Sequence, residues 1–578
     1  MPQTSAQQMR VQQIKAANQS SKSKQQIKKV EIMGEEQREG TEPRKKHKFD
    51  WGWRTVLIAA ALFWVLCSIF ALQRFYNFFP TFVSFDQGIF NQVFWNSLHG
   101  RWFESSLSSS ESSAVQLDNQ LPEVFYRRLA QHFTPALLLW LPVYALFQSP
   151  AGLSLLQVTL MTAGGLVLYA LARHYHPPHV SALIAVSYFC ANAVIAPTLA
   201  NFHDFSQIPL FVFGLLWAME KRRWWLFALL LGLTLVVRED AGVITFGVGF
   251  YMAASRRFLW AGVAVCVLSL GYMLLLTNWV MPLFAPDISR RFMVEQFGQF
   301  TNGQEASTLE VLWAILRSPD KVLAEVVNPP GRTLSYVLAQ WLPLAFVPVI
   351  SLDAWLLTGF PLLKLLLQQD PTALSMHLRY AVSLVPGLFY GAILWWHKHP
   401  HWFRPRLRQF WLFCLGLALL FTVTSNPNRA LSVFIPDSIQ PWVYTSPARQ
   451  WEHAQAVRSL LRQIPADASV TATGNIVAHL SSRREVLRYP GTRLINDDRK
   501  QIGVEYAVLD FWYPLRFSPA FPDEARSFFG MTNRVLGWLR DGSFGLVDFQ
   551  DGVALLRRGV PSSPEAAAAW NQFHQPLD

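Results

Sequence analysis

Nine ionisable residues stand beside the apolar runs of this sequence, and they include the side chains best suited to chemistry. They are Asp86, His132, His203, Asp204, Arg238, Glu239, Asp240, His377 and Arg379. Carboxylates can accept a proton or bind a hard cation, and a guanidinium fork suits a phosphate. Ionisable residues at the ends of membrane helices face a bundle interior or a water-filled cavity more often than lipid. Their pattern indicates a site where several helices open to one face.

The elements that must position these residues are expected to be membrane-spanning helices. Apolar residues make up 51% of the chain and charged residues 15%, against about 25% charged in ordinary soluble domains. Runs such as 55–72 and 260–280 approach the roughly 20 apolar residues that a crossing needs. The net charge of +12 comes from short basic clusters between apolar runs, a distribution typical of orientation signals. We therefore expect no nucleic-acid partner.

The basic clusters predict the topology, because Lys and Arg are enriched in cytoplasmic loops. The tail 1–49 is rich in Gln, Ser and Lys and is expected to be disordered and cytoplasmic. The run 134–147 is short and contains Pro135 and Pro142, so it is interpreted as a juxtamembrane or re-entrant helix at the outer surface. The predicted crossings lie near 55–74, 151–172, 180–199, 205–219, 224–238, 241–255, 258–282, 334–350, 353–368, 379–396 and 409–424.

These eleven crossings define the expected domains. Residues 50–424 form an all-α transmembrane bundle with two outer loops, 75–150 with its juxtamembrane helices and the long polar connection 285–333. In the segment 425–578, polar helices alternate with short apolar runs, which favours a small α/β domain. The odd number of crossings places that domain outside the cell.

The stretch FVSFDQGIFNQVFWNSLHGR, residues 82–101, predicts an amphipathic helix lying flat on the outer leaflet. Apolar residues recur at helical spacing from Ile89 to Leu98, and Gln, Asn and His side chains occupy the other face. Asp86 is positioned as the N-cap and Gly100 as the terminator. Asp86 therefore has a structural interpretation as a cap beside the functional one.

The other candidate residues also have structural interpretations. His203 and Asp204 would end one helix and cap the next, and His132 would bond a carbonyl before Pro135. The two arginines would anchor their helices at the headgroups. For the nine residues taken together the functional interpretation is stronger, because caps at unrelated helix ends would be expected on both sides of the membrane.

Several long stretches resemble a known family. They are FDQGIFNQVFWNSLHGR, QHFTPALLLWLPVYALFQSP, NFHDFSQIPLFVFGLLWAMEKRRWWLFALLLGLTLVVREDAG, IPADASVTATGNIVAHLSSRREVLRYP and VEYAVLDFWYPLR. The resemblance is to the predicted bacterial membrane proteins grouped as domain of unknown function 2079, over about residues 55–515. That family looks like a distant member of the type C glycosyltransferases, which are polytopic and take sugars from polyprenyl-phosphate carriers.

The resemblance implies a role for each residue. The acid that type C enzymes keep in their first outer loop falls on Asp86, which would be the general base, and a second outer acid falls on Asp204. Asp204 would orient the acceptor or, with Glu239 and Asp240, bind a divalent cation such as Mg or Mn. The family triplet Lys-Glu-Asp is Arg-Glu-Asp here. The phosphate would be held by Arg238 or Arg379, and the three histidines would line the substrate site, namely His132, His203 and His377.

The expected partners are membrane lipid, a polyprenyl-phosphate-linked sugar and an acceptor that is a glycan, a lipid or a protein. The expected location is the bacterial inner membrane. Two other functions stay open: a transporter or flippase that uses the same charges as a path, and a non-catalytic envelope assembly protein. Transporters tend to have repeated halves and charges at the midplane, whereas these charges are predicted to gather at one surface.

Overall fold

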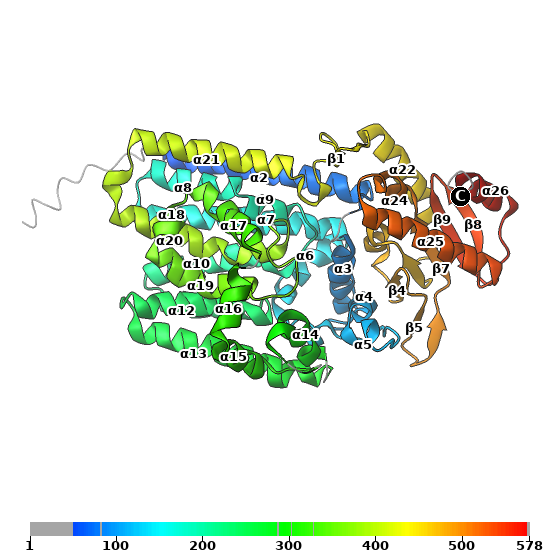
Figure 1. The fold of residues 1–578 in the computed structure, drawn as a ribbon, viewed down its shortest axis with the longest axis horizontal. Helices are drawn as coiled ribbons and strands as arrows, with labels where there is room; N and C mark the ends of the chain where they lie inside the picture. Colours follow the sequence, from blue (N-terminus) through cyan, green and yellow to red (C-terminus); the bar gives the residue numbers. More distant parts are fainter. Residues whose placement is uncertain are drawn as a thin grey trace, which may run out of the picture. The chain divides into compact units, whose positions relative to one another are not determined.

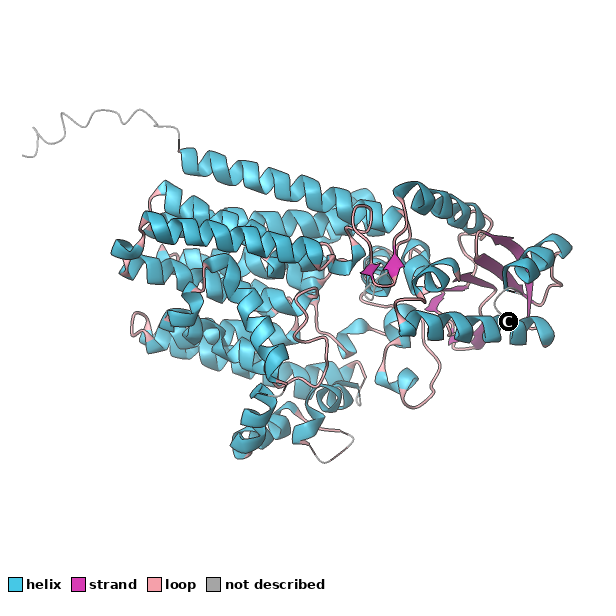
Figure 2. Cartoon of the chain, turned by 45° about the horizontal axis from the view of Figure 1, so that its top comes forward, coloured by secondary structure: helices cyan, strands magenta, loops and turns pink. Residues whose placement is uncertain are grey.

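The structure is a computed structural model that describes residues 50–80, 84–285, 288–301, 303, 305–327 and 329–574. The tail 1–49, for which disorder is predicted, lies outside the described residues. Within residues 52–578, helices form a bundle, and the strands gather in a separate C-terminal part of the chain (Figure 2). Figure 1 shows α3 and α4 between these two parts.

The bundle is built from helices that share one large apolar core. They are α2 (Trp51–Tyr76), α7 (Pro150–Tyr175), α8 (Pro178–Cys190), α9 (Asn192–Thr198), α10 (Ile208–Glu220), α11 (Trp224–Leu235), α12 (Gly242–Ala254), α13 (Leu259–Leu275), α19 (Leu352–Leu366), α20 (Val385–Lys398) and α21 (Pro405–Thr424). Small residues let α19 approach both neighbours closely. A Cβ on Gly391 of α20 would lie 2.4 Å from the Cα of Ala354, and one on Gly247 of α12 would lie 2.3 Å from the carbonyl oxygen of Leu357. Such contacts are typical of packed membrane helices.

Four helices of the described residues are long and apolar enough to cross a membrane: Trp51–Tyr76, Pro150–Tyr175, Leu259–Leu283 and Pro405–Thr424. The pair α8 and α9, bent by 46°, could form a fifth crossing. Helices also occur at the other predicted positions, but α10, α11, α12, α19 and α20 have only 12 to 15 residues. The number of eleven crossings therefore stays a prediction.

One predicted crossing, 334–350, is not a continuous helix. The chain leaves α17 (Pro330–Trp341), passes through Ala345 and Phe346 at positive φ, and resumes as α18 (Val347–Ile350). Pro343 and Pro348 explain the break, because proline removes a backbone donor and clashes with the preceding helical turn. A crossing by this segment therefore stays a prediction.

The segment 285–333 folds into more than the expected polar connection. It forms α14 (Ile288–Phe297), α15 (Thr308–Arg317) and α16 (Pro319–Val327). A capping box at Ser307 and Glu310 starts α15, which satisfies two backbone donors at its N-terminus.

The stretch 134–147 is a short turn and helix, with α6 at Leu141–Phe147. It belongs to the shorter apolar helices of the chain, and its juxtamembrane position stays a prediction. The preceding loop forms α4 (Ser106–Ser110) and α5 (Ser113–Gln116).

Helix α3 (Ser84–Leu98) exists as predicted, but its surroundings differ from the prediction. Its polar face is buried rather than solvated: Asn91 donates to Ser481 Oγ, and Gln92 donates to the carbonyl oxygens of Arg483 and Arg484. Because the C-terminal part supplies these partners, α3 packs inside the protein and does not lie flat on a leaflet. Gly100, at φ +77°, ends the helix as predicted.

The C-terminal part is an α/β domain, as the alternation of helices and apolar runs predicted. Its five-stranded sheet has the order β4-β3-β7-β9-β8, with β3 parallel to both neighbours and β9 antiparallel to β7 and β8. The elements are α22 (Pro447–Leu461), β3 (Val470–Ala472), α23 (Gly474–Val477), β4 (Val486–Arg488), β7 (Tyr506–Asp510), α24 (Trp512–Phe517), α25 (Pro522–Arg540), β8 (Phe544–Gln550), β9 (Val553–Arg558) and α26 (Pro564–His574). Two two-stranded ribbons complete the domain, β1 (Ser438–Ile439) with β2 (Trp442–Val443) and β5 (Arg493–Ile495) with β6 (Gln501–Gly503).

Helices cover both faces of this sheet. Val508 packs with residues of α22 and α3 on one face, whereas Leu509 packs with residues of α25 and α26 on the other. This is the period-two alternation of a strand buried on both sides. Helix α3 contributes Phe85 and Ile89 to the core on the first face, so the sheet packs against α3.

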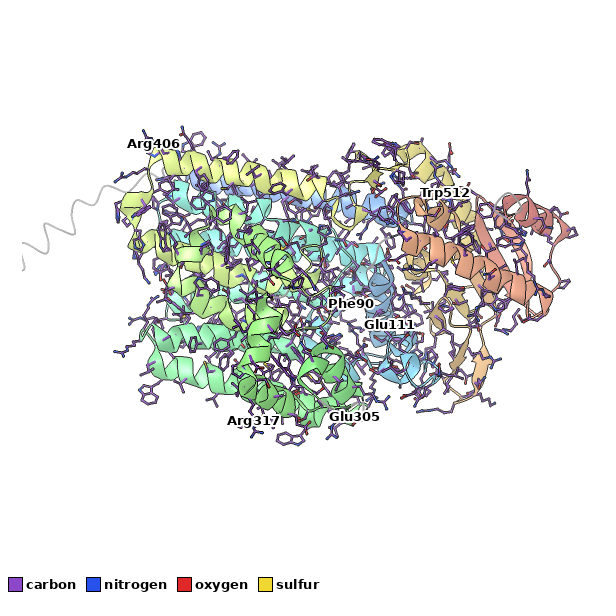
Figure 3. The ribbon with its side chains drawn as sticks, in the orientation of Figure 1. Phe90, Glu111, Glu305, Arg317, Arg406 and Trp512 are labelled. Carbon is purple, nitrogen blue, oxygen red and sulfur yellow. The ribbon has the colours of Figure 1, made fainter. Side chains whose placement is uncertain are left out.

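The two ends of the bundle differ in chemistry. Arg406, from one of the basic clusters predicted to be cytoplasmic, lies at the end away from the C-terminal domain, and Phe90 lies near the junction with that domain (Figure 3). This separation is the one that the charge-based topology requires.

Candidate functional site

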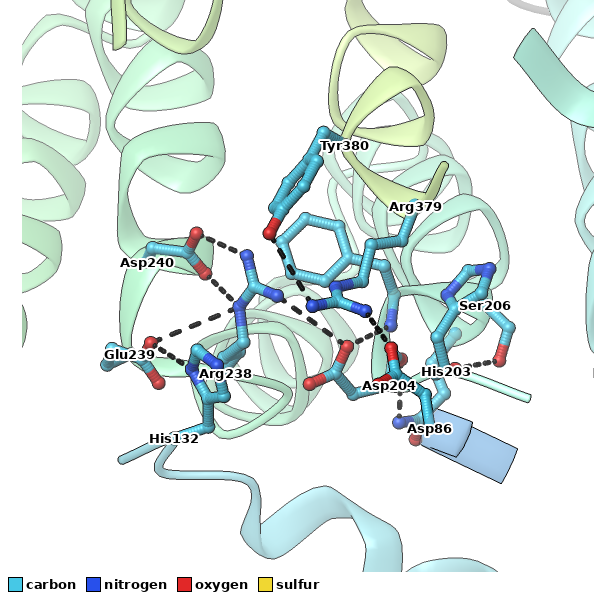
Figure 4. A network of polar contacts seen from close by, with 12 residues as sticks. Asp86, His132, His203, Asp204, Ser206, Arg238, Glu239, Asp240, Arg379 and Tyr380 are labelled. Carbon is cyan, nitrogen blue, oxygen red and sulfur yellow. Dashed lines mark hydrogen bonds and ion pairs between the residues drawn. The ribbon is translucent and has the colours of Figure 1, made fainter. Parts of the chain in front are cut away.

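Eight of the nine predicted residues come together in one polar network (Figure 4). Each stands at the end of an element. Asp86 is in the first turn of α3, Asp204 begins a turn before α10, and the triplet 238–240 lies between α11 and α12. Arg379 begins the turn before α20. Helix ends meet here because α10, α12, α19 and α20 pack side by side.

Arg238 is the centre of the network. Its guanidinium forms two hydrogen bonds with Asp240, Nε to Oδ1 at 2.7 Å and Nη2 to Oδ2 at 2.5 Å. Lys364, in the last turn of α19, also pairs with Asp240. Burial acts to raise the pKa of the Asp240 carboxyl, but Arg238 and Lys364 outweigh it and hold the pKa well below its ordinary value. Asp240 is therefore ionised and fully engaged.

Asp204 lies on the other side of Arg238, 3.9 Å from Nη1. Its Oδ1 accepts a hydrogen bond from the Phe205 amide, whereas its buried Oδ2 has no hydrogen-bond partner among the described residues. Burial acts to raise the pKa of Asp204, but the charges of Arg238, Arg379 and Arg128 outweigh it and lower the pKa. Asp204 is thus a carboxylate with one oxygen available to a ligand.

Asp86 pairs with Arg379, with 3.0 Å between Oδ2 and Nη1. The predicted N-cap role was wrong, because α3 begins two residues earlier at Ser84. The Asp86 side chain is 30% exposed, against 1% for Asp204, 9% for Glu239 and 15% for Asp240. Asp86 is the most accessible of the four carboxylates.

The histidines divide into three environments. His132 Nδ1 lies 3.0 Å from Glu239 Oε1; burial lowers the pKa of this imidazole, and Glu239 opposes the shift without outweighing it. His203 is buried beside Asp204, and burial lowers its pKa to about 3, so its ring is neutral. His377 is the one predicted residue outside the network; its Nε2 lies 3.2 Å from Ser425 Oγ, toward the C-terminal domain.

The carboxylates proposed as metal ligands do not fit a divalent cation. Asp240 is bound by two cations, Glu239 accepts from His132 and from the Phe133 amide, and Asp204 faces Arg238. Among the described residues, no group of three or more His, Cys, Asp or Glu side chains is arranged to hold a metal ion. We therefore assign no metal ligand in this network.

An apolar cavity of about 390 Å³ opens onto the network. Arg238, Asp240 and Lys364 stand at its polar end, and the remaining lining is mostly apolar. The walls come from α12, α13, α14, α15 and α19 and include Val243, Phe246, Leu270, Met273, Phe297, Val311, Leu312, Ile315, Phe360 and Leu363. An amphiphile with a long apolar chain and an anionic head matches this arrangement.

Sequence reasoning missed three residues of the site. Lys364 is a lone lysine within the run LLKLLL, a pattern that marks a functional candidate in a membrane helix. Arg128 lies four residues before His132, is buried, and donates to Ser108 Oγ at 3.1 Å. The ring of Tyr380 lies 5.7 Å from the guanidinium carbon of Arg238 and 5.2 Å from that of Arg379. Pattern gave no signal for Tyr380, since only folding brings it between two helices.

Comparison with known proteins places the chain in a family. The model of the family described as "Predicted membrane protein (DUF2079)" matches residues 74–555. The chain belongs to this family. It is a membrane protein, and the match includes every residue of the polar network. A search of curated proteins finds no match.

Two solved structures that resemble this chain at low sequence identity contain a bound polyprenyl-type phosphate. ArnT from Cupriavidus metallidurans, bound to undecaprenyl phosphate, has 11% identity and a TM-score of 0.46, covering 89% of this chain and 99% of that one. The oligosaccharyltransferase AglB from Archaeoglobus fulgidus, in complex with an inhibitory peptide and a dolichol-phosphate, has 12% identity and a TM-score of 0.40, covering 80% of this chain and 69% of that one.

Proposed function

We propose that this membrane protein is a glycosyltransferase that moves a sugar from a polyprenyl-phosphate donor to an acceptor at the outer face of the membrane, with Asp86 as general base. The observation that carries the proposal is a polar network that joins three features. These are an apolar cavity with Arg238 at its polar end, arginines with unused donors, and an accessible carboxylate.

The cavity suits the lipid part of the donor. Its apolar walls would bury an isoprenoid chain, and burial of apolar surface contributes about 25 cal/mol per Å². Lys364 and Arg238 at the polar end would stand next to the phosphate. Such a lipid would enter from the membrane, which the apolar surroundings of α13 and α15 allow.

Two arginines offer hydrogen bonds that the protein does not use. The Nε atoms of Arg128 and Arg379 are buried and have no hydrogen-bond partner in the part of the chain that the structure describes. Leaving a charged donor buried and unsatisfied costs more than about 1 to 3 kcal/mol. A phosphate that accepted these bonds would recover that cost, and it would recover most when the leaving group carries full negative charge.

Asp86 is the carboxylate best placed to act as base, because its side chain is the most exposed of the four. The acceptor oxygen would attack the anomeric carbon of the donor sugar while its proton passes to Asp86. The bond from that carbon to the phosphate oxygen would break, and its electron pair would leave with the polyprenyl phosphate. The Asp204 Oδ2 atom, which has no partner among the described residues, would orient the acceptor hydroxyl.

The decisive experiment is a transfer assay with the purified protein in lipid. Radiolabelled polyprenyl-phosphate sugars serve as donors and a native membrane extract supplies acceptors. We expect Asp86→Asn to lower transfer by at least about a hundredfold, the usual contribution of a general base. The matched control is Asp498→Asn, which removes an exposed carboxylate of the C-terminal domain and should transfer as the wild type does.

A folded Asp86→Asn variant that transfers at the wild-type rate would show that Asp86 is only an ion-pair partner of Arg379. If the wild type uses none of the donors, the donor class proposed here is wrong.

A further inference from the structure

A second, larger cavity lies between the end of the bundle and the C-terminal domain. Its volume is about 770 Å³, within the range of about 300 to 1,000 Å³ that small-ligand sites occupy. Unlike the first cavity, it has a mixed polar lining. One wall comes from the end of the bundle, at 372–378 and 426–429, and the other from the C-terminal domain.

The wall from the C-terminal domain is the carboxyl edge of its parallel strands. Thr473, Gly474 and Asn475 follow β3, residues 488–490 end and follow β4, and Asp510 ends β7. The chain passes from β3 to β4 on one side and then to β7 on the other side of β3. The strand order therefore reverses at β3, and open sheets bind ligands in the crevice at such a point.

A buried cluster of charged side chains lies behind the lining of this crevice, at the end of β7. His453 is fully buried, and its ring lies 3.2 Å from Asp510 Oδ2 and 2.9 Å from Asp551 Oδ2. Asp510 also accepts from Asn475 Nδ2 at 2.7 Å and from the Trp512 amide at 3.0 Å. Because Asp510 is fully engaged, it positions Asn475 rather than binding a ligand itself.

The lining offers hydrogen bonds that suit hydroxyl groups. Asn475 and Asn428 each donate both amide hydrogens to the protein, and neither Oδ1 atom accepts a hydrogen bond from any described residue. The Arg488 side chain makes one hydrogen bond, to Glu111 at 3.2 Å, and its other N–H groups have no acceptor among the described residues. A hydroxyl both donates and accepts, so it can use both kinds of group.

The charges of the lining argue against an anionic ligand. Arg429 pairs with Glu524 at 3.3 Å, and Arg488 pairs with Glu111. Asp510 and Asp523 add two further carboxylates to the lining. A phosphate or carboxylate ligand would meet cations that are already paired and acids that repel it, whereas a neutral ligand would not.

Two lining residues connect the cavity to the neighbourhood of the proposed catalytic pair. Leu378, which lines it, precedes Arg379 in sequence. The guanidinium carbon of Arg488 lies 4.8 Å from the ring centre of Phe85, the residue before Asp86. A ligand in this cavity would therefore lie near the elements that carry Asp86 and Arg379.

We propose that the cavity at the carboxyl edge of β3, β4 and β7 binds a neutral saccharide, the part of the acceptor that receives the sugar. The role of this saccharide as acceptor rests on the proposed function, but its binding can be measured without any transfer reaction. The C-terminal domain thus selects the acceptor, while the bundle holds the donor.

The test measures binding by the full chain in lipid nanodiscs. The probes are fluorescently labelled oligosaccharides released by mild acid from a native membrane extract. Gly474→Gln places a side chain in the cavity, and the protein tolerates it because a Cβ at Gly474 meets only the Phe85 Cβ, at 3.9 Å. Ser527→Trp fills the cavity from the exposed surface of α25. We expect both variants to bind at least about ten times more weakly than the wild type.

The matched control is Gly537→Gln, on α25 outside the lining, where an added Cβ also meets nothing within 4 Å. It should bind as the wild type does. Asp86→Asn should keep saccharide binding and lose transfer, so failure of the proposed chemistry and failure of this site give different results. The proposal is wrong if the wild type binds none of the oligosaccharides. It is also wrong if folded Gly474→Gln and Ser527→Trp bind them as well as the wild type does.

Discussion

The four carboxylates of the polar network have different roles because their neighbours differ. Asp240 neutralises two cations, Arg238 and Lys364, in a largely buried place. Asp86 has one partner and is partly exposed. Spacing in the sequence cannot make this distinction, since Asp240 and Glu239 are adjacent and yet bind different groups. The structure therefore separates a carboxylate that organises the site from one that can react.

This difference predicts opposite effects of two similar substitutions. Asp240→Asn leaves the buried Arg238 and the partly buried Lys364 without a full counter-charge, which should cost roughly 3 to 5 kcal/mol of stability and lower the unfolding temperature. Asp86→Asn breaks a partly exposed pair, which should cost about 1 kcal/mol or less. The measurement is thermal unfolding of each variant in nanodiscs.

The assignment of Asp240 as an organising residue fails if the Asp240→Asn variant is as stable as the wild type. It also fails if Asp86→Asn is the less stable of the two variants.

At the scale of elements, α3 joins the bundle to the C-terminal domain through buried amides. Gln92 accepts from Ser105 Oγ at 2.7 Å and from the Leu107 amide at 3.1 Å, and it donates to two carbonyls after α23. The sequence indicated an amphipathic helix, and the helix exists. The sequence did not indicate that another domain covers the polar face, because amides bind water and protein carbonyls equally well.

We predict that Gln92→Leu loosens this junction, because it leaves the Arg483 carbonyl and the Leu107 amide without their hydrogen-bond partner, at about 1 to 3 kcal/mol for each group. Limited proteolysis of the protein in nanodiscs should release a C-terminal fragment faster. Gln148→Leu is the control, since Gln148 is exposed. Equal rates for the two variants would mean that the amides of α3 do not hold the domain.

The His453 cluster predicts a dependence of stability on pH. Burial acts to lower the pKa of His453, but Asp510 and Asp551 outweigh it and raise the pKa from 6.5 to about 9. A pKa raised by folding stabilises the folded protein fully below the unfolded value and ceases to do so as the pH passes the folded value. The unfolding temperature should therefore fall between pH 6.5 and pH 9.

His453→Gln keeps hydrogen-bonding capacity but cannot carry a charge. In this variant we expect a lower unfolding temperature at pH 6.5 and a flatter profile up to pH 9. The same slope in variant and wild type would contradict the assignment.

At the scale of the whole molecule, the C-terminal domain lies at one end of the bundle, and Arg406 lies at the other (Figure 3). This arrangement agrees with a cytoplasmic face marked by Lys and Arg and an outer face that carries the site. The direction of insertion itself stays a prediction.

Labelling in intact spheroplasts tests that direction. A membrane-impermeant maleimide should label Asp498→Cys, in the C-terminal domain, and should not label Lys221→Cys, in a basic cluster between α10 and α11. Both positions are exposed. The unmodified chain supplies the background, because its four cysteines lie in apolar helices. If only Lys221→Cys were labelled, the orientation in the membrane would be the opposite of the predicted one.

The sequence by itself determined the class of protein, the helical bundle, the C-terminal α/β domain and eight of the residues that meet in the network. Apolar runs, periodicity and the cost of burying charge act locally, so they can be read along the chain. Tertiary structure decided which carboxylate remains accessible and that Lys364, Arg128 and Tyr380 join the site. It also formed two cavities, one lined mostly by apolar residues and one of mixed polarity. These properties depend on contacts between elements up to hundreds of residues apart, and no local pattern carries that information.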